Sequence, residues 1–239
     1  AKLILTPENT CFMRFPLNLR PKDAPPQEGH EVLTAIQALA KELGVWIIIG
    51  SLGVKLDDGR LANRSFVISD AGEVVNTYDK IHMFDVDISE TESYRESKTI
   101  KPGERGVVAD TGVAKVGLSI CYDLRFPYLY RELAQNGANI LTIPAAFTVP
   151  TGKAHWEVLL RARAIENGAF VMAAGQTGEH ENGHKTWGHS MIIGPWGEIL
   201  AEKADGVGII TADLNLDDVV KAHNAIPALQ HDRAFQVNS

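Results

Sequence analysis

The sequence predicts an α/β fold built around mixed β-sheets, and two patterns support this. Short apolar runs of strand length alternate with segments of helical periodicity along the 239 residues. Hairpin signals interrupt this alternation. Asp70-Ala71-Gly72 has the composition of a tight turn and lies between the strand-like runs 64–68 and 73–78. Because hairpins add antiparallel pairs to a sheet that helical crossovers would otherwise make parallel, we expect mixed sheets.

The first half of the chain is expected to contain a short strand, a helix and a buried strand before that hairpin. Residues 2–5 form a brief apolar run, which Pro7 ends. Residues 31–43 carry the apolar stripe of an amphipathic helix, and Gly44 suits the position after its last turn. The β-branched run 45–49 has the composition of a buried strand.

The second half again alternates strands with helices. A hairpin is expected around Pro195-Trp196-Gly197-Glu198, and the most regular helical pattern covers residues 155–167. The other expected strands are 107–108, 113–120, 139–143, 170–174 and 207–212, and the other expected helices are 216–222 and a segment that begins at Pro127 and ends at Gly137.

Composition and charge exclude several classes of function. Apolar residues make up 45% of the chain and charged residues 22%, as in ordinary globular proteins. The net charge of −7 argues against nucleic-acid and anionic-membrane partners, since both need basic patches. No apolar run approaches the length of a membrane span. Two cysteines, Cys11 and Cys121, cannot form a disulfide framework, so a reducing, cytoplasmic setting is expected.

Cys121 lies at a predicted bend between a strand and a helix. The apolar run 116–120 leads into it, and Pro127 suits the first turn of the helix that follows. Sites in open α/β sheets gather beyond the carboxyl ends of strands, and a nearby helix N-terminus favours a thiolate. This position suits a nucleophile, although an isolated cysteine is more often inert packing.

Two further reactive side chains follow predicted strands. Glu8 comes after the run 3–5, and Lys80 comes after the strand 74–78. If these strand ends share one edge of a sheet with Cys121, the carboxylate can act as a base for the thiol. The ammonium can lower the thiol pKa and stabilise an oxyanion. Taken singly, Glu8 could instead cap a backbone N–H, and Lys80 could be solvated.

Nucleotide and metal chemistry find no support in the sequence. It contains no GxGxxG, Walker A or HExxH motif and no cysteine–histidine metal spacing.

Several longer stretches resemble the carbon–nitrogen hydrolase (nitrilase) superfamily, and specifically its Nit-type amidases. They occur in the family's order over nearly the whole chain. They are Leu5-Thr6-Pro7-Glu8-Asn9, residues 78–87 (YDKIHMFDVD), residues 120–127 (ICYDLRFP), residues 155–167 (HWEVLLRARAIEN), Trp187-Gly188-His189-Ser190 and Pro195-Trp196-Gly197-Glu198.

The resemblance implies a fold and a site. The fold would be a four-layer α-β-β-α sandwich, formed by residues 1–239 as a single carbon–nitrogen hydrolase domain. Cys121 would be the nucleophile, Glu8 the general base, and Lys80 the oxyanion holder, assisted by the backbone N–H of Tyr122. Glu96 matches a second glutamate near the lysine, although most carboxylates in such a polar loop are simply solvated. No cofactor would be needed.

The implied reaction is hydrolysis of a small carboxylic-acid amide to acid and ammonia through a cysteine thioester. The best match is to amidases of deaminated glutathione, followed by other ω-amidases. A nitrilase acting on a small nitrile, acyl transfer to an amine, and a non-catalytic assembly protein stay open as alternatives. The family also implies a homodimer or a higher homo-oligomer. Relatives begin with a strand and a helix that precede Ala1 here, so the domain is expected to be incomplete at its N-terminus.

Overall fold

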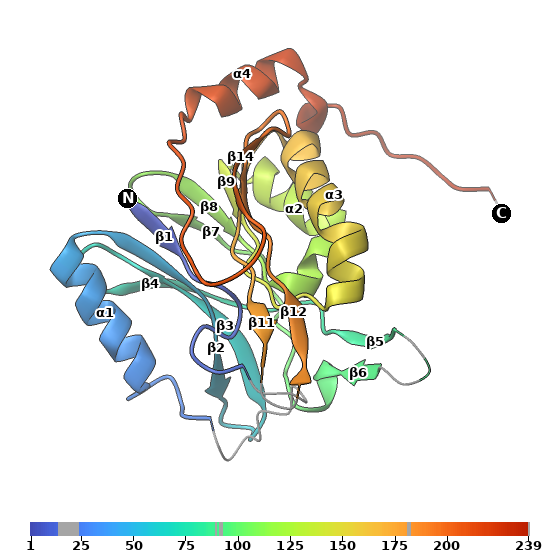
Figure 1. Ribbon diagram of the computed structural model, residues 1–239. Helices are drawn as coiled ribbons and strands as arrows, with labels where there is room; N and C mark the ends of the chain where they lie inside the picture. Colours follow the sequence, from blue (N-terminus) through green and yellow to red (C-terminus); the bar gives the residue numbers. More distant parts are fainter. Residues whose placement is uncertain (14–23, 89, 91–92, 181–182, 239) are drawn as a thin grey trace.

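The computed structural model describes residues 1–13, 24–88, 90, 93–180 and 183–238, which form two β-sheets covered by helices (Figure 1). The strands are β1 (Leu3–Leu5), β2 (Trp46–Lys55), β3 (Leu61–Ile68), β4 (Val74–Asp79), β5 (Asp85–Asp87), β6 (Ser93–Arg95), β7 (Val108–Asp110), β8 (Lys115–Leu118), β9 (Ile140–Thr142), β10 (Phe170–Ala173), β11 (Thr177–Glu179), β12 (Lys185–Trp187), β13 (Ser190–Ile193) and β14 (Ile199–Lys203). The helices are α1 (Glu31–Leu43), α2 (Pro127–Gln135), α3 (Val149–Asn167) and α4 (Asp217–Ala225), with 3₁₀ turns at Glu96–Lys98, Cys121–Arg125 and Ala228–Gln230.

The first sheet has four strands in the order β1-β2-β3-β4, with β1 parallel to β2 and the other pairs antiparallel. Successive side chains of a strand point to opposite faces. Ile47 and Ile49 of β2 therefore pack with Leu33 and Ala40 of α1, while Ile48 between them faces the other way. Helix α1 thus covers one face of this sheet.

The second sheet has six strands in the order β14-β13-β10-β9-β8-β7. Its central strands β8, β9 and β10 are parallel, and the flanking pairs are antiparallel. Both sheets therefore contain parallel and antiparallel pairs, which confirms the predicted mixed α/β architecture.

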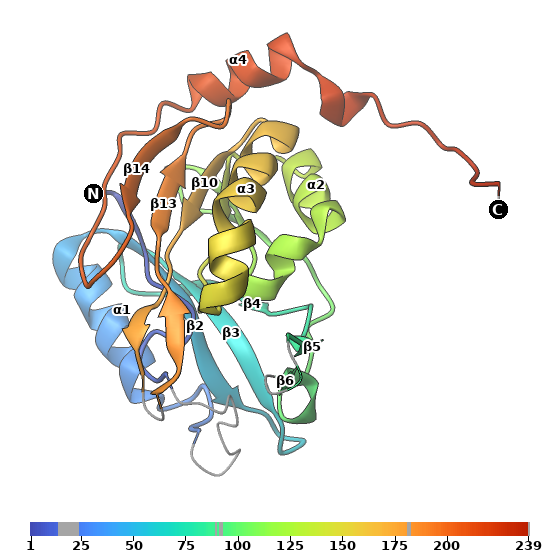
Figure 2. The same ribbon diagram turned by 45° about the vertical axis from the view of Figure 1, so that its right-hand side comes forward.

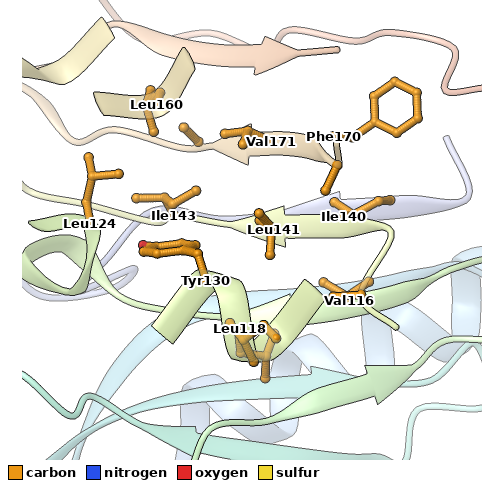
Figure 3. Close-up of a cluster of buried hydrophobic side chains, with 14 of the residues drawn as sticks. Val116, Leu118, Leu124, Tyr130, Ile140, Leu141, Ile143, Leu160, Phe170 and Val171 are labelled. Carbon is orange, nitrogen blue, oxygen red and sulfur yellow. The ribbon is translucent and has the colours of Figure 1, made fainter. Parts of the chain in front are cut away.

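The two sheets face each other across the largest core cluster, in which Ile48 and Val67 of the first sheet join Val116 and Leu118 of β8. Side chains of α2 and α3, including Tyr130 and Leu160, belong to the same cluster (Figure 3). Helices α2 and α3 lie on the outer side of the six-stranded sheet, and α1 lies on the outer side of the other sheet (Figures 1 and 2).

Most of the predicted elements are present. Helix α1 covers the predicted residues and ends at Gly44, which has a φ of 61°. The hairpin β3-β4 and the hairpin β13-β14 are both formed. Two further hairpins, β5-β6 and β11-β12, stand apart from the main sheets (Figure 1).

One predicted boundary and one predicted strand were wrong. Helix α3 contains the predicted residues 155–167 but begins earlier, at Val149, with Pro150 in its first turn, where a proline is tolerated. The described segment 207–212 is not a strand: its β-branched residues are largely exposed, with Val207 97% and Ile209 89% accessible. A β-strand requires a neighbouring strand as hydrogen-bond partner, and the composition of a segment does not show whether it has one.

Within the described residues, no helix is both long and apolar enough to cross a membrane.

Candidate active site

Cys121 occupies a sharp bend between β8 and α2. Its φ of 51° is unusual for a residue other than glycine. Its N–H donates to the carbonyl of Pro144 at 2.9 Å, and its side chain is buried. The short 3₁₀ turn that begins at Cys121 leads into α2 at Pro127. The predicted strand, bend and helix around the cysteine are confirmed, and the backbone conformation there is held by its surroundings.

Glu8 follows β1 and is 4% exposed. One carboxylate oxygen accepts from the backbone N–H of Ala146 at 2.9 Å. The other accepts from Asn63 Nδ2 at 2.9 Å and from Lys80 Nζ at 3.2 Å. A buried charge is stable only when it is paired and hydrogen-bonded, and Glu8 meets both conditions. Glu8 therefore does cap a backbone N–H, as the alternative interpretation had it, but it does so while buried and paired with Lys80.

Lys80 comes directly after β4 and is 2% exposed. Its ammonium donates to Glu8 and to both oxygens of Glu96, at 3.1 and 2.9 Å. Burial disfavours the ammonium, but the carboxylates of Glu8 and Glu96 outweigh burial and raise the pKa of Lys80 well above its ordinary value. Lys80 is therefore a fixed positive charge, not a solvated side chain.

Glu96 begins the 3₁₀ turn after β6 and is buried, although the sequence around it is polar. Besides Lys80, it accepts from the backbone N–H of Phe84 at 2.7 Å and from Asn63 Nδ2 at 3.3 Å. The burial of Glu96 excludes the interpretation that it is solvated.

The thiol of Cys121 does not match the expected thiolate. Burial raises its pKa well above the ordinary value, and the neighbouring Glu8 carboxylate raises it further. The ammonium of Lys80 and the N–H of Ala146 lower the pKa, but they do not cancel burial. Lys80 therefore lowers the pKa of the thiol as predicted, but the net shift of that pKa is upward. The resting cysteine is a neutral thiol within hydrogen-bonding reach of Glu8.

The three side chains do not share one sheet edge, as the sequence suggested. Glu8 and Lys80 follow strands of the four-stranded sheet, while Cys121 follows β8 of the six-stranded sheet. They meet because the two sheets are stacked face to face.

Asn63 of β3 was missed in the sequence. Its side-chain amide donates to both Glu8 and Glu96, while its Oδ1 has no partner among the described residues. The sequence signal that could have identified it was a polar residue within β3, the strand that pairs with β4. Asn63 precedes the expected strand 64–68, however, and belongs to no recognised motif.

The cluster opens into a cavity of about 420 Å³, its mouth included. Tyr122 lies in the cavity wall next to the cysteine. The lining residues are Glu8, Lys80, Phe84, Tyr94, Cys121, Tyr122, Ala146, Phe147, Thr148 and Thr151. Across the described ranges, no group of three histidine, cysteine, aspartate or glutamate side chains is arranged to hold a metal ion.

Known proteins resemble this chain in both sequence and fold. A family model described as carbon–nitrogen hydrolase matches residues 1–224. A deaminated glutathione amidase of Yersinia enterocolitica is 40% identical over 235 residues, which cover 97% of this chain and 82% of that protein. The crystal structure of the C. elegans NitFhit protein superposes with a TM-score of 0.89 at 35% identity, over 97% of this chain and 57% of that chain.

A mutant of the amidase from Nesterenkonia sp. AN1 superposes with a TM-score of 0.76 at 25% identity, over 94% of this chain and 81% of that chain. Its structure has the acetamide moiety of fluoroacetamide added covalently to an active-site cysteine. With a family match along almost its full length, this chain belongs to the carbon–nitrogen hydrolase family.

Proposed function

We propose that the protein is a cysteine-dependent amidase, with Cys121 as nucleophile, Glu8 as general base and acid, and Lys80 as oxyanion holder. The observation that carries this proposal is the convergence of these three side chains, distant in sequence, on one cavity. A neutral thiol beside a buried carboxylate requires that carboxylate to take its proton, which is the task of a general base.

The first half of the reaction breaks the C–N bond. Cys121 Sγ attacks the amide carbon while its proton moves to the carboxylate of Glu8. The oxyanion that forms is stabilised by the ammonium of Lys80 and the backbone N–H of Tyr122. The amide nitrogen is a poor leaving group, so Glu8 returns the proton to it, and ammonia departs from a thioester at Cys121.

The second half releases the acid. Glu8 takes a proton from water, and the oxygen attacks the thioester carbon. The C–S bond then breaks, and the proton returns to the sulfur of Cys121. Glu96 holds the ammonium of Lys80 in place through both halves, because its two oxygens accept from Nζ.

The substrate we infer is a small ω-amide of a carboxylic acid, with deaminated glutathione the first choice. The name of the Yersinia relative supports this choice. The cavity also has a cation beside it: the guanidinium of Arg125 lies 5.9 Å from the ring centroid of Tyr122 and 5.6 Å from that of Phe147. Both rings line the cavity whereas Arg125 itself does not, so its charge would attract a substrate carboxylate across these rings.

The test is ammonia release from a panel that contains deaminated glutathione, 2-oxoglutaramate, neutral aliphatic amides and small nitriles, with Cys121→Ala measured in parallel. We expect turnover of an anionic amide that is abolished by Cys121→Ala, and a raised KM for that amide but not for a neutral one in Arg125→Met. Turnover of nitriles alone would overturn the amidase proposal. Release that persists in Cys121→Ala would overturn the role of the cysteine, and no release at all would favour a non-catalytic protein.

We further propose that residues 1–239 form one four-layer α-β-β-α domain that assembles as a homodimer or a higher homo-oligomer in the cytoplasm. The support for assembly is an apolar outer surface on α3 and the β13-β14 turn, where Val158, Ile165 and Trp196 are 68, 55 and 61% exposed. Light scattering on the purified protein tests this, and a monomer at micromolar concentration would contradict it.

A further inference from the structure

Asp123 is a fully buried carboxylate two residues after Cys121, and the proposed reaction makes no use of it. It accepts four hydrogen bonds. Its Oδ2 accepts from the hydroxyl of Tyr78 at 2.7 Å and from the N–H of Ile120 at 2.8 Å. Its Oδ1 accepts from the backbone N–H of His82 at 3.0 Å and is 2.7 Å from His82 Nδ1. A buried carboxylate with this many donors is a strong and specific anchor.

The donors lie next to the proposed catalytic residues Lys80 and Cys121 in the chain. Tyr78 and His82 lie two residues before and two residues after Lys80. Ile120 directly precedes Cys121, and the N–H of Asp123 also donates to the carbonyl of Ile120 at 3.1 Å. One carboxylate therefore joins the end of β4, which carries Lys80, to the bend after β8, which carries Cys121. These segments belong to different sheets, and this link connects them next to the cavity.

The donors are themselves held in place. Burial first, and then the charge of Asp123, raise the pKa of Tyr78 well above its ordinary value, so its hydroxyl stays protonated and keeps donating. The His82 ring stacks on Phe126, with centroids 3.6 Å apart and planes 8° apart. Its Nε2 contacts the hydroxyl of Tyr128, so a proton on Nδ1 can be directed at Asp123.

We propose that Asp123 is a positioning residue that sets the distance and orientation of the Lys80 ammonium relative to the Cys121 thiol. Among the described residues, neither Asp123 nor His82 lines the cavity, so Asp123 acts through the two segments rather than on substrate. This inference rests on the proposed function, since it assumes that Cys121 and Lys80 act on the same carbonyl group of the substrate. Misplacing reacting groups by about 1 Å costs on the order of 100-fold in rate.

The central test compares Asp123→Asn with Asp79→Asn. Asparagine keeps the shape but replaces one accepting oxygen with an NH₂ group, which cannot accept from Tyr78 and Ile120, or from His82. Asp79 is a matched control because it directly precedes Lys80 but pairs with Arg64 inside the same sheet, at 2.6 and 2.8 Å. For an amide that the wild type hydrolyses, we expect kcat to fall about 100-fold in Asp123→Asn with KM changed less than about threefold. Asp79→Asn should keep a kcat close to that of the wild type.

A second measurement does not depend on the substrate. Iodoacetamide labelling followed by peptide mass spectrometry gives separate rates for Cys121 and for the exposed Cys11. We expect Asp123→Asn to slow the labelling of Cys121 at least tenfold while the rate at Cys11 is unchanged. A purely structural role would lower the melting temperature but leave this ratio and the kcat of the folded enzyme unaltered.

Tyr78→Phe removes one donor and keeps the ring, which covers the case in which Asp123→Asn does not fold. It should lower kcat and Cys121 labelling in the same direction, and the double variant should be no worse than Asp123→Asn alone. Wild-type rates in Asp123→Asn, or in Tyr78→Phe if only that variant folds, would overturn the proposal. If the wild type hydrolyses no amide, the proposed function fails, and the labelling ratio alone decides on Asp123.

Discussion

The ammonium of Lys80 lies 2.9 Å from Oε2 of Glu96, and both side chains are buried. Glu8 accepts from the same ammonium at 3.2 Å, so one positive charge is shared by two carboxylates. This arrangement fixes Lys80 and distinguishes the two carboxylates. Glu8 contacts the thiol, whereas Glu96 accepts from Lys80, from the backbone N–H of Phe84 and from Asn63.

Glu96→Gln should impair catalysis without preventing folding. The amide keeps the shape but turns one acceptor into a donor, which would face Lys80 together with either the N–H of Phe84 or the amide of Asn63. We expect kcat to fall by about 10- to 100-fold because the ammonium is no longer held. The free energy of unfolding should drop by about 1–3 kcal/mol for the buried group left unpaired. Steady-state kinetics and thermal melts measure both effects. The exposed Glu90, changed to Gln, is the control and should resemble the wild type.

Glu8→Gln should abolish the reactivity of the thiol as well as turnover. Because the pKa of Cys121 is raised by burial, the resting thiol is neutral and depends on a neighbouring base. Loss of a general base typically costs about 100-fold or more. Labelling of Cys121 by iodoacetamide at pH 7 should slow by at least that factor, with labelling of Cys11 as the internal reference. Undiminished labelling would mean that the thiolate forms without Glu8.

Stability should decline more steeply in mild alkali when Cys121 is present. In the unfolded chain the thiol ionises near its ordinary pKa of about 8.5, whereas in the folded protein the pKa is raised. Above pH 8.5 the unfolded state loses a proton that the native state still holds, so stability falls by up to about 1.4 kcal/mol per pH unit until the folded pKa is reached.

The comparison that isolates this effect is Cys121→Ala against its parent, both in a Cys11→Ser background, with melting temperatures taken from pH 7 to 10. The parent should lose stability faster than Cys121→Ala above about pH 8.5. The raised pKa of Lys80 also makes stability fall as the pH rises. The stability that Lys80 contributes is fully present below about pH 10.4, however, and is lost only at higher pH. Parallel curves for the two proteins would contradict the raised pKa of the thiol.

Gly50→Ala should disturb the loop that carries Glu8. A methyl group at this position of β2 would overlap the carbonyl oxygens of Thr6 and Pro7 and lie 2.6 Å from Cβ of Pro144. Overpacking of this kind typically costs about 1–3 kcal/mol, and it would shift Glu8, so both melting temperature and kcat should fall. Gly106→Ala is the control, since its methyl group would meet only side-chain atoms at 3.6 and 3.7 Å. If Gly50→Ala and Gly106→Ala changed melting temperature and kcat equally, overpacking against the Glu8 loop would not explain the result.

Local elements were predictable where the pattern is short-range. Helix α1 was found from its apolar stripe and Gly44, and the bend at Cys121 was found from the apolar run before it and Pro127 after it. The segment 207–212 shows the limit, because its β-branched composition predicts a strand only when another strand lies beside it.

Residue order and local pattern were enough to identify the family, the mixed α/β class and Glu8, Lys80, Glu96 and Cys121 as candidate residues. The folded structure was needed to see that Glu8 and Lys80 meet Cys121 across two stacked sheets, and that Glu96 is buried. The structure also showed that Asn63 donates to Glu8 and that Asp123 accepts from Ile120, next to the cysteine. Burial in the fold keeps the resting thiol of Cys121 neutral. Burial and through-space charge set these properties, and both depend on residues that are distant along the chain.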